Sequence, residues 1–91
     1  MPKEVPVTVE WMRKRPPGDT YSTMSRFPED ADDSPRWSVV LNFLARAVSG
    51  GANWRATARF LVEEAPQERL TAGAQFELYE GRTRTAIVTV L

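Results

Sequence analysis

The chain of 91 residues contains no cysteine and no histidine. Disulfides, thiol nucleophiles, imidazole bases and the usual zinc ligands are therefore excluded together. No apolar run approaches the length of a membrane span, and the N-terminal segment, MPKEVPVTVEW, lacks the apolar stretch of a signal peptide. These absences predict a cytoplasmic protein with no membrane partner, no cofactor and no catalytic role.

The chain also lacks an excess of charge of either sign, because twelve Lys and Arg residues balance twelve Asp and Glu residues. A net charge of zero gives no general attraction to nucleic acid or to an anionic membrane, so either partner would require a local cluster. Hydrophobic residues make up 42% of the chain, which is enough for a packed core. At this length we expect one domain, residues 1–91, with no second module.

Period-two alternation of apolar and polar residues predicts four strands before residue 63. They are Val5–Trp11, Thr20–Phe27, Trp37–Phe43 and Trp54–Val62, with the odd residues of the first and third strands and the even residues of the fourth facing inward. Pro6 cannot donate to a ladder and predicts an edge or a strand start. The intervening segments are rich in proline, glycine and charge, which indicates loops.

The C-terminal third carries the clearest pattern, a β-hairpin. Two β-prone runs, Gln75–Tyr79 and Thr83–Val90, flank a short connection that contains Gly81. With Phe76 and Leu78 inward, the apolar partner set is Ala86, Val88 and Val90, and the outward set is Glu77, Thr83, Thr85 and Ile87. Opposed residues share a face, so this pairing requires an odd-numbered loop. We expect the three-residue loop Tyr79-Glu80-Gly81, with Gly81 in the left-handed conformation of a G1 bulge.

Six strands separated by long loops favour a closed barrel over an open sheet, because closure removes exposed edges. The segments Leu70-Thr71-Ala72-Gly73, Gln75-Phe76-Glu77-Leu78 and Glu80-Gly81, followed by Arg, Thr and a closing β run, resemble the end of the C-terminal β-barrel domain of elongation factor Tu. Small stand-alone bacterial proteins share this ending. The resemblance covers roughly the last third of the chain, and it implies an all-β fold, a six-stranded antiparallel Greek-key barrel. It further implies a binding module that acts through protein–protein contacts, with a protein partner or by self-association.

A second hypothesis is binding of the tRNA backbone through a local basic patch, as the resemblance also implies for such a barrel. The candidate nucleic-acid-binding or partner-binding residues are Arg13, Lys14, Arg15, Arg82 and Arg84. Arg55 and Arg59 form a further basic pair on one outward strand face. The alternative is that these side chains are solvated and paired with Glu10, Glu77 and Glu80. The zero net charge and the lack of an exposed aromatic ladder favour that alternative.

Other polar and aromatic residues favour structural roles. The acidic loop Glu29–Asp33 fits a docking surface or, preferably, a solubilising loop, and without the Gly and bidentate Glu of a calcium loop it predicts no metal site. Three tryptophans on inward strand positions favour core packing over base stacking: Trp11, Trp37 and Trp54. Asp19 and Ser22 have no base at a recognisable spacing, and Ser49-Gly50-Gly51 is not followed by the Lys-Ser/Thr of a P-loop. We therefore expect neither enzymatic activity nor GTP hydrolysis.

Overall fold

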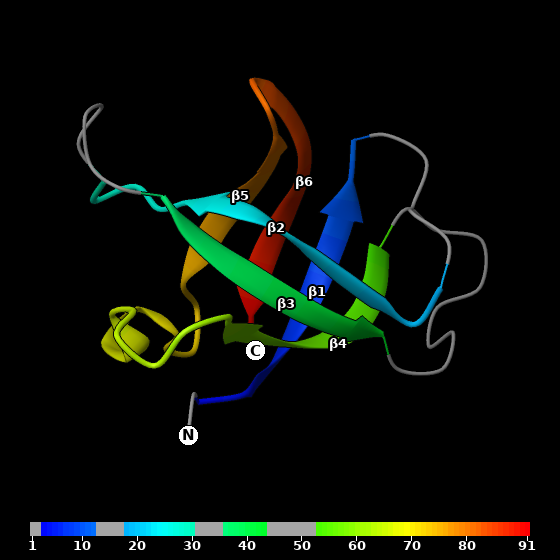
Figure 1. Cartoon of the computed structure of the whole chain (residues 1–91). Coiled ribbons are helices and arrows are strands. Elements are labelled where there is room, and N and C mark those ends of the chain that lie inside the picture. The colour runs from blue at the N-terminus through cyan, green and yellow to red at the C-terminus, as the bar shows by residue number, and fades with distance from the viewer. Residues whose placement is uncertain (1–2, 13–17, 31–35, 44–52) are drawn as a thin grey trace.

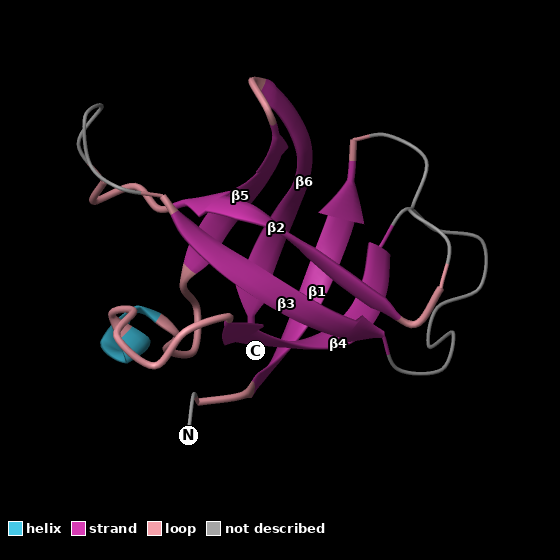
Figure 2. Ribbon diagram, viewed as in Figure 1, coloured by secondary structure: helices cyan, strands magenta, loops and turns pink. Residues whose placement is uncertain are grey.

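Six antiparallel strands close into a barrel (Figure 1, Figure 2). The computed structural model describes residues 3–12, 18–30, 36–43 and 53–91. The strands are β1 (Val5–Trp11), β2 (Thr20–Arg26), β3 (Trp37–Phe43), β4 (Asn53–Phe60), β5 (Gln75–Glu80) and β6 (Thr83–Val90), and a single 3₁₀ turn within these ranges, η1, spans Gln67–Arg69. The prediction of an all-β, six-stranded barrel is confirmed.

The strand order around the barrel is β1-β4-β3-β2-β5-β6, and β6 pairs with β1 to complete the circle. Strands β2, β3 and β4 are successive neighbours, and β1 lies beside β4, which is a Greek-key arrangement. Pro6, predicted at an edge or a strand start, is the second residue of β1, and its carbonyl accepts the Leu91 N–H at 3.0 Å. Its ring nitrogen faces the same way, toward the end of β6, so no interior ladder bond is lost.

Alternate residues of the strands fill the interior, as the period-two patterns predict. The largest fully buried side chains are Phe60, Phe76, Leu41, Leu70 and Leu78, with valines from β1, β3 and β6 between them. The predicted end of the fourth strand is wrong, because β4 ends at Phe60 and Val62 is 40% exposed. The Leu61 N–H donates to the Ser38 carbonyl at 2.9 Å, and the chain turns after this residue. Ala65, rather than Val62, is the next buried residue of the core.

The β5–β6 hairpin has the predicted inward faces but not the predicted loop. The expected core residues of β6 are all buried: Ala86, Val88 and Val90. Glu80, however, pairs with Thr83, so the turn has two residues, Gly81 and Arg82, rather than three. Gly81 has the predicted positive φ, at 62°, and no non-glycine residue of the described ranges does. Glycine at the first position and a negative φ at the second are typical of a type II′ turn.

Thr85 is an extra residue in β6. It allows a two-residue turn to connect two strands whose buried residues would otherwise require an odd-numbered loop. Two consecutive residues of β5 pair with β6 residues that are two apart: Leu78 with Ala86, and Tyr79 with Arg84. Thr85 lies in this bulge and is buried, its hydroxyl donating to the Leu78 carbonyl at 3.3 Å and its own carbonyl accepting the Met12 N–H at 2.9 Å. One inserted residue exchanges the inward and outward positions of β6, as an odd-numbered loop would. The prediction of an outward Thr85 is therefore wrong, although the core face is right.

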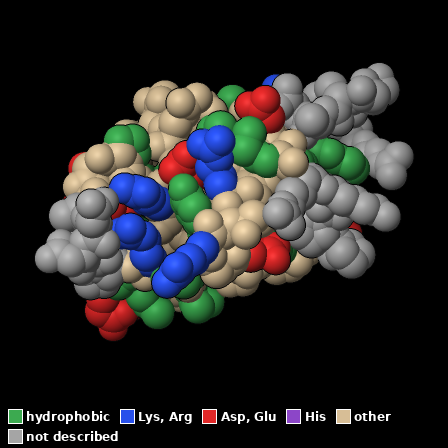
Figure 3. All heavy atoms as spheres, turned by 90° about the horizontal axis from the view of Figure 1, so that it is seen from above, with side chains coloured by type: hydrophobic (Ala, Val, Ile, Leu, Met, Phe, Trp, Pro, Cys, Tyr) green, Lys and Arg blue, Asp and Glu red, His purple; other side chains and the backbone are tan. Residues whose placement is uncertain are grey.

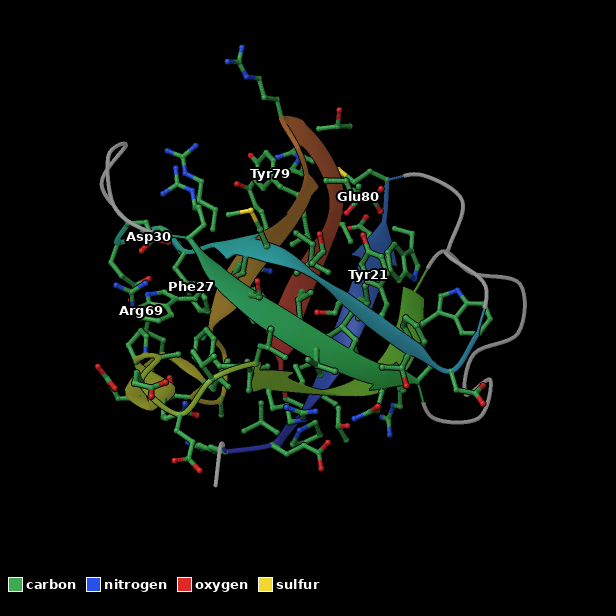
Figure 4. The ribbon with its side chains drawn as sticks, in the orientation of Figure 1. Tyr21, Phe27, Asp30, Arg69, Tyr79 and Glu80 are labelled. Atoms are coloured by element: carbon green, nitrogen blue, oxygen red, sulfur yellow. The ribbon has the colours of Figure 1, made fainter. Side chains whose placement is uncertain are left out.

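A partly buried ion pair holds the chain just after β2, beside η1 (Figure 4). Phe27 follows β2, is 2% exposed and stacks on Phe76 with ring centroids 4.6 Å apart. Asp30, whose side chain is also 2% exposed, accepts the Phe27 N–H at 2.9 Å and the Arg69 Nη1 donor at 2.6 Å. The Arg69 guanidinium lies 5.4 Å from the centroid of the Phe27 ring. These contacts hold the segment after β2 against η1.

Replacing Gly81 by alanine tests the turn. A Cβ there would meet no atom within 4 Å, so its cost is backbone strain at positive φ, about 1–2 kcal/mol of unfolding free energy. Arg82→Ala, at the neighbouring turn position with negative φ, is the control and is expected to cost under about 0.5 kcal/mol. Urea unfolding of both variants measures the difference, and equal stabilities would contradict the turn type.

Replacing Phe76 by alanine tests the face assignment of β5. Because Phe76 is 1% exposed and stacks on Phe27, we expect a loss of about 3–5 kcal/mol, much of the stability of so small a domain. Glu77→Ala, one residue along on the outer face, removes an exposed ion pair and should cost about 0–1 kcal/mol. A larger loss from Glu77→Ala than from Phe76→Ala in chemical denaturation would reverse the assignment.

The Asp30 carboxylate makes stability depend on pH. Burial raises its pKa, but the Phe27 N–H and the Arg69 guanidinium outweigh burial, so the pKa lies below its usual value of 3.8. A lowered native pKa contributes stability that is fully present above pH 3.8 and is lost as the pH falls through the native pKa. We expect Asp30→Asn to lower the melting temperature at neutral pH and to flatten the acid decline below about pH 4. The exposed Glu29→Gln is the control, and a decline unchanged in Asp30→Asn would refute the assignment.

Candidate functional site

Three arginines surround a hollow on the outer face of the barrel, beside the β5–β6 turn. The hollow has a volume of about 210 Å³ and is lined by Met24, Ser25, Arg26, Arg36, Tyr79, Gly81 and Arg82. We call it the arginine hollow. Figure 3, seen from above Figure 1, shows Lys and Arg side chains gathered on this face. Among the described residues that line it there is no carboxylate.

Strand register brings the arginines together from three separate segments. The β2–β3 ladder ends at the pair Ser25 and Trp37, and the next residue on each side is Arg26, the last residue of β2, and Arg36, which immediately precedes β3. The β2–β5 register pairs Met24 with Tyr79, and the turn that carries Arg82 follows just beyond that pair. The hollow thus gathers three arginines that lie far apart in the sequence.

Two carboxylates near this region are bound by arginines that do not line the hollow. Arg84 Nη1 lies 2.6 Å from Glu77 Oε2, and the Tyr79 hydroxyl donates to Glu77 Oε1 at 3.2 Å. The Arg84 guanidinium holds the pKa of Glu77 below its usual range, and the charge of Arg26 lowers that pKa further. Asp30 is likewise held by Arg69, outside the hollow. Both acids also lie close enough to the hollow for the charge of a lining arginine to lower their pKa, Arg26 that of Glu77 and Arg36 that of Asp30.

The sequence-predicted basic residues are split by the structure. Arg82 lines the hollow and is exposed, whereas Arg84 is engaged with Glu77. Arg13, Lys14 and Arg15 lie outside the described residues, as do Ser49-Gly50-Gly51 and Ala31 to Asp33 of the acidic loop. Met12, just before the basic triplet, bonds to Thr85, so β1 ends on the same side of the barrel as the Gly81-Arg82 turn.

Arg26 and Arg36 were not among the residues singled out from the sequence. Arg26 ends a polar run and Arg36 ends an acidic, proline-containing loop, so neither belongs to a basic cluster in the chain. The signal that could have found them is the hairpin register, because both border strands that are successive in sequence. That register depends on the loop between them, which the pattern of apolar residues does not determine.

Aromatic side chains from β1, β2 and β3 form a cluster. Trp11 is buried and packs on Tyr21 and Phe43, with ring centroids 5.6 and 5.9 Å apart. Trp37 and Trp54 are half-buried against the core. The tryptophans thus pack in the interior, as predicted, although only Trp11 is fully enclosed. Its Nε1 has no hydrogen-bond partner among the described atoms.

Tyr21 links β2 to the end of β5. Its hydroxyl donates to the Glu80 carboxylate (Figure 4), and the neighbouring Thr23 hydroxyl donates to the Tyr79 carbonyl. Burial raises the pKa of Tyr21, and the carboxylate of Glu80 raises it further. The residue is therefore a neutral donor at physiological pH, and its role is to tie the two strands together.

Comparison with protein-family models, with curated proteins and with solved structures gave no match to this chain. The resemblance to the C-terminal domain of elongation factor Tu thus stays a prediction, while the barrel itself stands on the strand pairing. Within the described ranges, no three Asp or Glu side chains group as metal ligands. Those ranges contain no helix long and apolar enough to cross a bilayer.

Proposed function

We propose that this protein is a non-catalytic binding module, resembling the C-terminal domain of elongation factor Tu, that docks an acidic segment of a partner protein on the arginine hollow. The observation that carries the proposal is the convergence of Arg26, Arg36 and Arg82 around one hollow. Guanidinium groups bind carboxylates through paired, charge-assisted hydrogen bonds. A cluster of them on one face supplies a local attraction that the zero net charge of the whole chain does not.

The remaining lining residues support a protein partner. Met24 is 43% exposed, and Tyr79 is half-buried beside it. Arg, Tyr and Met are the residue types enriched at protein interfaces, where an apolar body and a polar tip contact the same partner. A hollow walled by Met24 and Tyr79 and edged by arginines suits a segment in which acidic and apolar residues alternate.

The lining also favours binding over chemistry. The Ser25 hydroxyl donates to the Trp37 carbonyl at 2.6 Å, and the Tyr79 hydroxyl donates to Glu77. Neither hydroxyl has a base among the described lining residues.

RNA is the second candidate ligand, and one observation favours it. Arg82 is exposed at the Gly81-Arg82 turn, and Met12, the residue after β1, donates its N–H to the Thr85 carbonyl on the same side of the barrel and precedes the basic triplet 13–15 in the sequence. A nucleic-acid backbone needs several phosphate contacts in a row, whereas Arg84 is committed to Glu77. The compact hollow therefore fits an acidic peptide better than a phosphate track.

Charge reversal at Arg82 tests the proposed function. We expect a fluorescent Glu-rich peptide to bind the wild-type protein, and Arg82→Glu to weaken binding about tenfold or more. Arg55→Glu is the matched control, because Arg55 is exposed on β4, away from the hollow, and the net-charge change is the same. Fluorescence polarisation measures both, and we expect the control to stay within about twofold.

Parallel titration with tRNA at two salt concentrations separates the candidates. Tight tRNA binding that falls steeply with salt, with no peptide binding, would replace the protein partner by RNA. Binding of neither ligand, or an equal loss in Arg55→Glu and Arg82→Glu, would overturn the assignment of the arginine hollow.

A further inference from the structure

Strand β5 begins before the ladder that joins it to β2. Gln75 is the first residue of β5, whereas the last pair of the β2–β5 ladder is Arg26 with Glu77. We propose that this open end of β5 pairs with an extended segment of a partner protein that carries a Lys or Arg residue. The surface is separate from the arginine hollow, and among the described lining residues the two share Arg26 alone.

The backbone N–H and C=O of Gln75 point to the open side. Successive residues of a strand direct these groups to opposite neighbours. The Val90 N–H donates to the Ala74 carbonyl at 2.8 Å, so residue 74 bonds to β6, and residues 75 and 77 turn their backbone groups to the β2 side. Within the part of the chain that the structure describes, Gln75 has no backbone partner on that side. Such open backbone groups are a template for pairing with another chain.

Pro28 explains why β2 does not continue along β5. Two residues beyond the last pair, the register would place Pro28 opposite Gln75. Proline has no N–H to donate to the Gln75 carbonyl, so the ladder cannot be extended by this chain. The chain turns instead, and the Asp30 N–H donates to the Phe27 carbonyl at 3.0 Å. Gln75 therefore keeps one donor and one acceptor for a second strand.

Two adjoining hollows lie beside this open backbone. Their volumes are about 390 and 640 Å³, and both are lined by Phe27, Pro28 and Gln75, so they form one groove, which we call the β5 groove. Its apolar walls are Phe27, Pro28, Phe76, Ala74 and Ile87. A groove beside an open strand accepts an extended peptide, because the backbone forms hydrogen bonds and alternate side chains enter the hollows.

The charges of the larger hollow favour a basic residue. Three charged side chains line it: Glu29, Glu68 and Arg69. Arg69 Nη1 lies 2.6 Å from Asp30 Oδ1, so a carboxylate already balances that guanidinium. Glu29 and Glu68 are exposed, and within the described ranges neither forms an ion pair or a side-chain hydrogen bond. A Lys or Arg of the partner segment would lie near both carboxylates.

Amide hydrogen exchange of the protein alone tests the open end. We expect the Gln75 N–H to exchange within about tenfold of an unprotected amide. The next two amides, of Phe76 and Glu77, should be protected about 100-fold or more, because they pair with β6 and β2. Equal protection of all three amides would show that Gln75 has an internal partner and would overturn the proposal.

The docking test uses a short labelled peptide of alternating Val and Thr with Lys at both ends. We expect it to bind and to protect the Gln75 amide from exchange, and a peptide with Glu at both ends to bind about fivefold more weakly. N-methylation of one peptide residue at a time should weaken binding about threefold to tenfold at a single position, because one residue lies opposite Gln75. Methylation of its neighbours, whose N–H groups point away from β5, should stay within about twofold.

Variants at Gln75 separate the backbone from the side chain. Gln75→Pro removes the N–H on the side away from β6, at the first position of the strand, where proline is tolerated, and should weaken binding about fivefold or more. Gln75→Ala keeps the N–H and should stay within about twofold. Glu68→Gln should weaken the Lys peptide about threefold, and Asp19→Asn, before the opposite end of β2, should not change it. If Gln75→Pro fails to fold, the N-methylation series decides the outcome.

The other occupants give different results. A dimer in sedimentation that Gln75→Pro dissociates would assign the open end to a second copy of this chain. Equal affinity for the Lys and Glu peptides would overturn the basic residue, and binding of neither would overturn the docking site. Gln75→Pro should leave binding of the Glu-rich peptide at the arginine hollow within about twofold, so failure here is distinguishable from failure of the proposed function.

Discussion

Barrel closure depends on the pairing of β2 with β5, which spans only three residue pairs, from Met24 opposite Tyr79 to Arg26 opposite Glu77. The other neighbouring strands share at least five pairs. Without this short ladder, β2 and β5 would be edge strands, and one wall of the core would open to water. The barrel therefore relies on side chains to supplement the backbone at this seam.

Contacts on both sides of the ladder reinforce it. Beyond one end, the Tyr21 and Thr23 hydroxyls bond to the end of β5. Beyond the other end, Phe27 stacks on a β5 aromatic ring, and the Asp30–Arg69 pair holds the chain that follows β2. Asp30, whose side chain is 2% exposed, accepts hydrogen bonds from Arg69 and from a backbone N–H, so removing Arg69 would take away its charge-assisted donor. Polar groups thus secure the place where backbone pairing is shortest.

The same seam creates the arginine hollow. β2 is paired on one side with β3 and on the other with β5, and its last residue, Arg26, lines one hollow with Arg36 and Arg82. A sheet of this size offers few places where three segments meet on the outer surface. The bulge at Thr85 also shapes this region. It allows a two-residue turn to join β5 and β6 while Phe76, Leu78, Ala86 and Val88 all face the core. The strand pairings that close the barrel therefore also position the residues of the arginine hollow.

Local pattern determined the secondary structure and the faces of the strands. Alternation predicted β1 from Val5 to Trp11 and the buried valines of β6, because burial of every second side chain is the main free-energy term for a strand packed on one core. The glycine at position 81 was predicted from its conformational freedom alone. These features depend on neighbours in the chain, so the amino-acid order is sufficient for them.

Tertiary structure alone decided the rest. The extra residue of the hairpin could lie either in the turn or in a β-bulge. It lies in a bulge at Thr85, because the Thr85 hydroxyl bonds to the Leu78 carbonyl of β5 and the Thr85 carbonyl accepts the Met12 N–H after β1. Strand pairing, not local sequence, brings these partners together. Arg26 and Arg36 line the same hollow because they flank the last pair of the β2–β3 ladder, although ten positions separate them in sequence. Arg84, a candidate partner-binding residue in the sequence, forms an ion pair with Glu77, seven positions away on the neighbouring strand. The sequence shows which charged residues are present. Only the pairing of the strands determines which of them form ion pairs and which line the arginine hollow together.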